Sequence, residues 1–233
     1  MLTQERLGQL HSLEKKLGYV FNDINLLNKS LTHKSYANEI SGSLKNNERF
    51  EFLGDSVLDL IVSEHMVKKF PQYAEGQLSK IRAAVVNENC LAGIAGAMGL
   101  GEYLLLGKGE DLSGGRGKNS ILANAFEAVV GGIFSDSGLE SAARVFLPRL
   151  EEKIIEYTGS GQVKDFKSEL QEVTQVSRGC VPSYNIVGES GPDHEKLFEV
   201  TVMIGDDIMG GGKGRTKKEA EQMAAKMALE KLT

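Results

Sequence analysis

Cysteine is scarce in this sequence, with only Cys90 and Cys180 among 233 residues. The two are far apart, and neither lies in a CxxC or Cys/His spacing of the kind that holds zinc. The sequence therefore supports neither a disulfide framework nor a structural zinc site. Hydrophobic residues make up 41% and charged residues 25% of the chain, which is typical of a globular protein and excludes disordered and collagen-like chains.

Long hydrophobic runs are also missing. The longest stretch without a charged residue, residues 89–101, is rich in glycine and alanine and falls short of the roughly 18 apolar residues that a membrane-spanning helix needs. Charged residues interrupt the apolar ones in residues 5–16, whereas a signal peptide has an uninterrupted apolar core. We therefore expect no membrane-spanning helix, no membrane partner and a cytoplasmic protein.

An excess of basic charge is missing as well, because the formal net charge is −5. Taken alone, this value argues against a polyanionic partner. The average hides a local patch, since residues 208–218 contain no acid and four cations, Lys213, Arg215, Lys217 and Lys218. Such a patch is typical of surfaces that bind phosphates.

Hydrophobic periodicity divides the chain into two regions. Residues 1–157 have apolar residues at three- and four-residue spacing, which predicts helices, in residues 2–17, 48–70, 78–98, 120–134 and 139–157. Residues 158–163 begin with a small, polar, glycine-containing stretch typical of a linker. Residues 164–233 predict a helix (165–175), three strands (183–189, 196–204 and 207–211) and a helix (217–232). The predicted fold class is an all-α N-terminal domain followed by a small α+β domain of order α-β-β-β-α.

Two features favour close packing within the second region. Gly205 and Asp206 form a two-residue turn signal between the second and third predicted strands. Ala220, Ala224 and Ala228 repeat every four residues, which gives the last helix a small-residue face that can lie against a sheet.

Residues 47–56 place three carboxylates on one face of a predicted helix. At about 100° per residue, with Glu48 at about 0°, Glu51 falls at about 300° and Asp55 at about 340°. Like charges at these spacings repel, and no lysine or arginine interleaves on that arc. The arc therefore predicts a site for a hard divalent cation such as Mg²⁺, with a bound water as nucleophile for phosphodiester hydrolysis. The alternative is a solvated acidic helix face.

Two further features favour the metal interpretation. Phe52 lies in the acidic arc, away from the apolar stripe that contains Leu60, so its ring is expected to bury against something else. Asn124 and Glu127 share one face of a second predicted helix at i,i+3 spacing and are candidates for further ligands.

Glycine-rich stretches at residues 114–119 and 210–214 suggest phosphate loops. Neither has the GxxxxGK[ST] spacing, because Leu112 stands where the first needs glycine and Gly214 follows Lys213 in the second. No nucleotide cofactor is therefore expected.

Several blocks of this sequence resemble the motifs of a known family. Residues 47–56 (NERFEFLGDS) closely resemble the signature of ribonuclease III, and residues 31–36, 75–76 and 120–128 resemble its accompanying blocks in the family's order. The C-terminal region resembles a double-stranded RNA-binding domain. The resemblance implies a helical, homodimeric endonuclease that cuts both strands of duplex RNA with Mg²⁺, with Mn²⁺ able to substitute. It also implies 5′-phosphate and 3′-hydroxyl ends and a role in rRNA and mRNA processing.

The resemblance also assigns roles to individual acids. Glu51 and Glu127 match metal-binding glutamates, and Asp55 matches an essential aspartate beside the metal. Glu48 and Glu75 match two further acids that line the cleavage valley. All five are therefore expected at or near the catalytic site.

Two more positions follow from the resemblance. Phe52 matches an aromatic residue that inserts into the partner subunit of the homodimer. Asn124 stands where the family usually has aspartate. Its amide oxygen can still ligate a metal but brings no charge, so a weaker hold on Mg²⁺ is expected. The alternative function is a weakened or inactive dimeric protein that only binds double-stranded RNA.

The basic patch is the expected contact with RNA. Lys217 and Lys218 lie in the first turn of the last predicted helix, where the helix dipole disfavours cations. Bound phosphates would satisfy both the lysines and the free backbone N–H groups, whereas the alternative is a solvated charge run. The resemblance adds Gln171 and Glu172 in the first helix of the second region, and His194 between its first two strands, as groups that reach successive minor grooves.

Overall fold

The computed structural model describes residues 2–40, 45–159, 166–192 and 196–232. The chain forms two compact units, Met1–Val163 and Lys164–Thr233, and each is described by itself. None of the helices in the described ranges has the length and apolar character that a membrane crossing requires.

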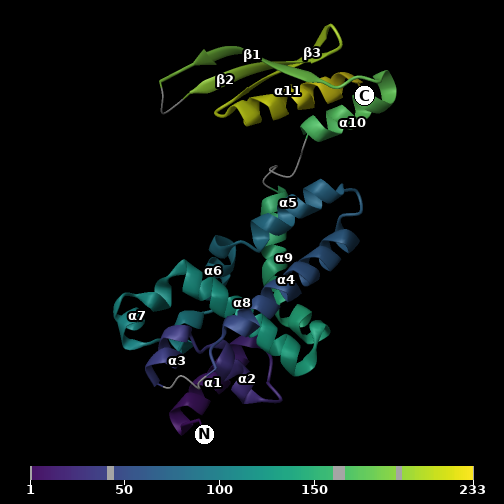
Figure 1. Ribbon diagram of the computed structural model, residues 1–233. Helices are drawn as coiled ribbons and strands as arrows, with labels where there is room; N and C mark the ends of the chain where they lie inside the picture. Colours follow the sequence, from purple (N-terminus) through teal and green to yellow (C-terminus); the bar gives the residue numbers. More distant parts are fainter. Residues whose placement is uncertain (1, 41–44, 160–165, 193–195, 233) are drawn as a thin grey trace. The chain divides into compact units, whose positions relative to one another are not determined.

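The first unit is helical, as predicted (Figure 1). Its α-helices are α1 (Gln4–Leu17), α2 (Ile24–Ser30), α3 (Lys34–Ile40), α4 (Glu48–Lys69), α5 (Glu75–Val85), α6 (Glu88–Ala97), α7 (Lys108–Leu112), α8 (Asn119–Ser137) and α9 (Leu139–Gly159). Two short 3-10 helices, η1 (Leu100–Tyr103) and η2 (Gly115–Gly117), precede and follow α7. Within the described residues, the β pairing of this unit is a single bridge between Thr32 and Leu105.

Helix α8 is the central element of the first unit. Phe126 of α8 is fully buried, and its ring meets that of Phe146 in α9 edge-on, with 5.0 Å between the ring centroids. Helix α4 packs along α8 and buries Val57, Leu58 and Ile61. Helix α8 is thus the support against which the acidic face of α4 is held.

Two helix boundaries differ from the sequence prediction. The single helix expected over residues 78–98 is broken into α5 and α6, because Asn87 caps a new helix by accepting a hydrogen bond from the Cys90 backbone N–H at 3.0 Å. Helix α9 continues to Gly159, and the Thr158 hydroxyl donates to the Ile154 carbonyl at 2.8 Å. The first two residues of the expected linker 158–163 are therefore helical, while residues 160–163 lie outside the described ranges.

The second unit has the predicted order of elements. Helix α10 (Phe166–Arg178) is followed by the strands β1 (Ser183–Ser190), β2 (Leu197–Ile204) and β3 (Asp207–Gly214) and by helix α11 (Lys217–Leu232). The strands form an antiparallel sheet in the order β1-β2-β3. Both helices cover the same face of the sheet (Figure 1). The predicted turn is present between β2 and β3, where Gly205 has a φ of 63°.

Glycines allow β3 and α11 to approach closely. A Cβ atom at Gly210 would overlap the Ala224 carbonyl, and one at Gly212 would overlap the Ala220 carbonyl. Ala220 and Ala224 are fully buried, and so is Ala228. The alanine face predicted for this helix therefore lies directly against the sheet.

Candidate active site

The candidate active site lies where α4 crosses α8. A Cβ atom at Gly54 of α4 would overlap the backbone carbonyl of Glu127 in α8, and one at Gly131 of α8 would overlap the carbonyl of Phe50 in α4. A glycine on each helix thus lets the two backbones touch, which side chains would prevent. The crossing places Glu127 beside the acidic face of α4.

Three carboxylates come together at this crossing. Burial, followed by the charges of Asp55 and Glu51, raises the pKa of Glu127 to about 7. The pKa of Glu51 is raised by burial and by the charges of Glu48 and Asp55, while Lys34 opposes the shift. Negative charge is therefore in excess at this position, and both groups would ionise more readily beside a cation.

The carboxylate and amide oxygens at the crossing suit a hard cation, although they do not already surround a single point. Within the described ranges, no three His, Cys, Asp or Glu side chains converge as a ready metal cage. Asn124 is partly buried, one turn before Glu127 on α8, and its amide adds a neutral oxygen. Mg²⁺ usually takes one or two carboxylates and completes its shell with waters. The close crossing of α4 and α8, which brings Glu127 near Asp55 and Glu51 and raises the pKa of Glu127, favours such an ion here.

The two remaining acids occupy different positions. Glu48 is exposed and accepts a hydrogen bond from the Asn46 amide at 3.0 Å, and its carboxylate lies 3.5 Å from the Lys34 ammonium. It adjoins the three carboxylates at the start of α4. Glu75 begins α5 and accepts a hydrogen bond from the Ser79 hydroxyl at 2.7 Å. No contact among the described residues joins Glu75 to the crossing, so its catalytic assignment stays a prediction.

Phe52 is exposed, as its helical position predicted, with 79% of its surface accessible. Two apolar residues further along α4, Leu60 and Val67, are also exposed. Leu60 was expected in the core stripe, and that expectation is wrong. One side of α4 therefore presents an apolar surface next to the acidic site.

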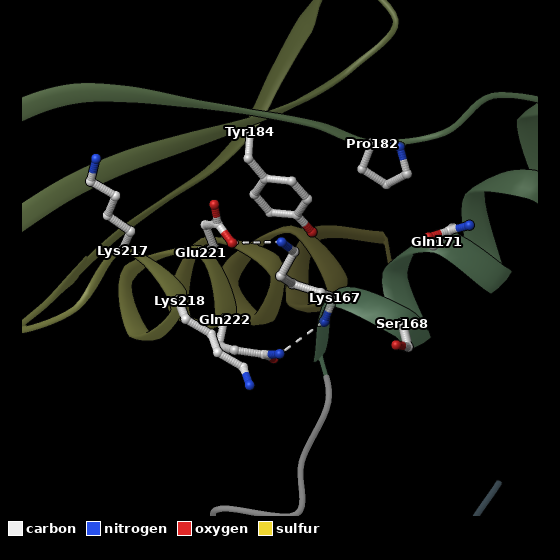
Figure 2. Close-up of a pocket in the computed structure, with 9 residues that line it drawn as sticks. All are labelled: Lys167, Ser168, Gln171, Pro182, Tyr184, Lys217, Lys218, Glu221 and Gln222. Atoms are coloured by element: carbon white, nitrogen blue, oxygen red, sulfur yellow. Dashed lines mark hydrogen bonds and ion pairs between the residues drawn. The ribbon is translucent and has the colours of Figure 1, made fainter. Parts of the chain in front are cut away.

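Residues predicted to contact RNA line one cavity in the second unit. Gln171 of α10 and Lys217 and Lys218 of α11 lie around a cavity of about 550 Å³ (Figure 2). In the lining of this cavity, the Lys167 ammonium donates to the Glu221 carboxylate at 2.6 Å and lies 4.4 Å from the centre of the Tyr184 ring. Lys167 is thus engaged within the unit and partly buried, whereas Lys217 and Lys218 are exposed.

Two lysines of the basic patch in residues 208–218 lie near acidic residues, which the sequence alone did not indicate. The Lys213 ammonium lies 3.0 Å from Glu199, and that of Lys217 lies 3.9 Å from Glu189. Arg215 and Lys218 are exposed, as is Glu172 of α10.

The start of α11 is also partly capped from within. The Glu219 N–H donates to the Thr216 hydroxyl at 3.1 Å, while the Glu219 carboxylate accepts from the Arg215 N–H at 2.8 Å. Fewer backbone donors are therefore left for a phosphate than expected. His194, the remaining predicted RNA contact, lies outside the described residues.

Comparisons with known proteins cover both units. The family model described as ribonuclease-III-like matches residues 23–154, and the double-stranded RNA binding motif matches residues 166–232. A ribonuclease 3 from a Nitratiruptor species is 48% identical over 223 residues, which span 96% of each chain. The chain belongs to the ribonuclease III family.

Further relatives agree with this family. Ribonuclease 3 from Borreliella burgdorferi is 45% identical, across 98% of this chain and 93% of that protein. A solved structure of the nuclease domain of ribonuclease III from Campylobacter jejuni matches with a TM-score of 0.58 and 46% identity, over 62% of this chain and 97% of that one. The resemblance inferred from residues 47–56 is thereby confirmed.

Sequence reasoning missed the residues that position the ribonuclease III carboxylates. Gly54 and Gly131 form the crossing, and their one signal in the sequence is a glycine inside each helical pattern, which often has a packing reason. Lys34 and Asn46, which hold Glu48, gave no such signal because neither shares a helix face with it.

Proposed function

We propose that this chain is an endoribonuclease that hydrolyses phosphodiester bonds of double-stranded RNA with a metal-activated water. The observation that carries the proposal is the α4–α8 crossing, which gathers Glu51, Asp55 and Glu127 and raises the pKa of Glu127 to about 7. Duplex RNA as substrate is supported by the double-stranded RNA binding motif in residues 166–232. The comparisons give no support to the alternative of an inactive binding protein.

Mg²⁺ is the proposed cofactor, and Mn²⁺ suits the same oxygen donors. Glu51, Glu127 and the Asn124 amide oxygen would hold it. When bound, such an ion polarises a phosphoryl oxygen and makes a water more acidic. Asp55, exposed one turn along α4 from Glu51, would accept a hydrogen bond from the attacking water and orient it.

Hydrolysis at this site would give defined ends on the RNA. Attack of the water oxygen on phosphorus forms one P–O bond and breaks the bond to the 3′ oxygen, which takes up a proton. The products carry a 5′-phosphate and a 3′-hydroxyl, and no covalent intermediate with the protein forms. Glu48 and Glu75 are proposed to line the path of the RNA as further acids.

A homodimer is the proposed assembly. The exposed ring of Phe52, with Leu60 and Val67 on the same helix, supports an apolar contact with a second copy. A buried aromatic anchor at the centre of an interface contributes roughly 2 kcal/mol or more. Sedimentation is expected to show a wild-type dimer at micromolar concentration that weakens in Phe52→Ala, and a wild-type monomer would contradict it.

The RNA contacts of the second unit are likewise proposals. Lys217 and Lys218 would neutralise phosphates, and Gln171 and Glu172 would reach a minor groove from α10. The other members of this proposed surface are Lys213, Arg215 and His194. A role in rRNA and mRNA processing and a cytoplasmic location stay predictions from the sequence.

Cleavage of long duplex RNA in Mg²⁺ tests the function directly. Wild type is expected to cut duplex but not single-stranded RNA and to stop when EDTA is added. Glu127→Gln is expected to lose cleavage and keep duplex binding, because it removes a metal ligand and leaves the second unit intact. Glu140→Gln, which changes an exposed acid of α9, is the matched control. Binding without cleavage by wild type at any Mg²⁺ or Mn²⁺ concentration would favour the inactive alternative.

A further inference from the structure

Three cations gather at the start of α4, outside the acidic site and outside the second unit. Lys29 lies in the last turn of α2, Lys45 just before α4, and Arg49 in the first turn of α4. The charges of Lys45 and Arg49 reach Lys29 and, after burial, lower its pKa. None of the three forms an ion pair with a residue in the described ranges, and Glu48 lies near Lys34 instead.

Lys29 is held in place by an aromatic ring. Its ammonium lies 4.0 Å from the centre of the Phe50 ring, and Phe50 itself is buried with 8% of its surface accessible. The ring face attracts the cation but carries no net charge to offset Lys45 and Arg49. Lys29 is partly buried, whereas Lys45 and Arg49 are exposed, so their charges repel an ammonium group that is already partly desolvated.

A purely structural role accounts for only one member of this cluster. A lysine in the last turn of α2 is stabilised by the helix dipole, so Lys29 alone needs no ligand. Arg49 is in the first turn of α4, where the same dipole disfavours a cation. An anion bound between the three side chains would remove both the repulsion and the dipole cost.

We infer that Lys29, Lys45 and Arg49, the α4 basic cluster, bind backbone phosphates of the duplex RNA. The inference rests on the proposed function, because it concerns the RNA that reaches Glu51 and Asp55. Arg49 precedes Glu51 by two residues, about 3 Å along the helix axis, but it points about 160° away from Glu51 around the helix. The cluster therefore flanks the acidic face, and a duplex that lies over that face would bring its neighbouring phosphates within reach of these long side chains. The planar fork of arginine also suits two phosphate oxygens.

This position gives the cluster a defined task. The carboxylates of the crossing repel a polyanion until a cation is bound, and the basic cluster would offset that repulsion for the adjacent phosphates. Contacts to phosphate carry no sequence information. The cluster would thus hold the duplex at the nuclease unit whatever its sequence.

The test is duplex binding by the full chain in EDTA, where no cleavage occurs, measured over a range of KCl concentrations. The variant Lys45→Gln/Arg49→Gln keeps Lys29 on the Phe50 ring. Its slope of log K against log salt is expected to fall in magnitude by up to about 2, with affinity about three- to tenfold weaker at a fixed salt concentration. Lys15→Gln/Lys68→Gln removes the same charge at exposed positions elsewhere and is expected to match wild type.

The outcomes separate this inference from its alternatives. An unchanged slope in Lys45→Gln/Arg49→Gln, with an unchanged unfolding temperature, overturns it. An unchanged slope together with a weakened dimer in sedimentation also overturns it, because the cluster would then face a second copy of the chain. If wild type fails to cut duplex RNA while the slope of the variant falls, the proposed function is wrong and the phosphate contact stands.

Discussion

Both units bring backbones into contact through glycine, but they do so with different surroundings. In the first unit, Gly54 and Gly131 lie within two long helices whose buried residues include large side chains such as Leu58 and Phe126 as well as several alanines. In the second, a row of glycines on β3 faces a row of alanines on α11, and half of the buried hydrophobic cluster is alanine. The α4–α8 contact is local and positions the carboxylates, whereas the contact between β3 and α11 forms much of the hydrophobic core of the second unit.

A displacement of the packed backbones therefore has a different consequence in each unit. At the α4–α8 crossing, a small displacement moves Glu127 away from Glu51 and Asp55, so the chemistry depends on it. Between β3 and α11, a displacement first costs stability and then moves Lys217 and Lys218 relative to the sheet. Substitutions that add a single methyl group can test the two cases.

The largest effect is expected for Gly54→Ala. The added methyl group overlaps the Glu127 carbonyl, and backbone offers no flexible end that can move aside. We expect at least about 3 kcal/mol of destabilisation and loss of duplex cleavage. Gly93→Ala is the control, because a Cβ atom there meets nothing within 4 Å and alanine favours a helix by about 0.5–1 kcal/mol. Wild-type cleavage by Gly54→Ala would show that the close crossing is not required.

A smaller effect is expected for Gly212→Ala in the second unit. The methyl group would overlap the Ala220 carbonyl, and overpacking of this kind costs about 1–3 kcal/mol. Duplex affinity is expected to fall, while the unfolding transition of the first unit stays in place. Gly211→Ala is a matched control on the same strand, since its nearest neighbour is the Val200 carbonyl at 3.9 Å. Equal duplex affinity in both variants would contradict the packing account.

The smallest effect is expected for Asn124→Asp. This change keeps the shape of the side chain and adds a negative charge next to Glu127. The Mg²⁺ titration of the cleavage rate should shift to lower concentration by several-fold, because a charged ligand binds the ion more tightly. Duplex binding without metal should stay unchanged. If the two titrations superimpose, Asn124 is too far from the ion to matter.

Sequence reasoning reached the site because its main signal is local. The spacing of Glu48, Glu51 and Asp55 fixes their shared face through helix geometry alone. Glu127 was found as a candidate, but its approach to α4 depends on a contact between residues far apart in the chain. A glycine in a helix does not say which carbonyl it touches, so the crossing could not be derived.

Exposure and charge pairing were less predictable than the site. Leu60 was placed in the core by its angle, yet the structure leaves it exposed because the helices packed on α4 do not cover that side. The patch around Lys213 looked unpaired in the sequence, since Glu199 lies on the neighbouring strand and reaches it only through sheet register. Both the exposure of Leu60 and the pairing of Lys213 depend on tertiary contacts, which hydrophobic periodicity in the sequence cannot predict.

The proposed function depends above all on a carboxylate site for a divalent cation at the α4–α8 crossing. Thermal unfolding of the full chain at pH 8, above the Glu127 pKa of about 7, tests it without RNA. A ligand that binds only the folded state raises the unfolding temperature with concentration. We predict that Mg²⁺ stabilises the transition of the first unit in wild type and has little effect in Glu127→Gln. Equal stabilisation of both proteins by Mg²⁺ would contradict the claim.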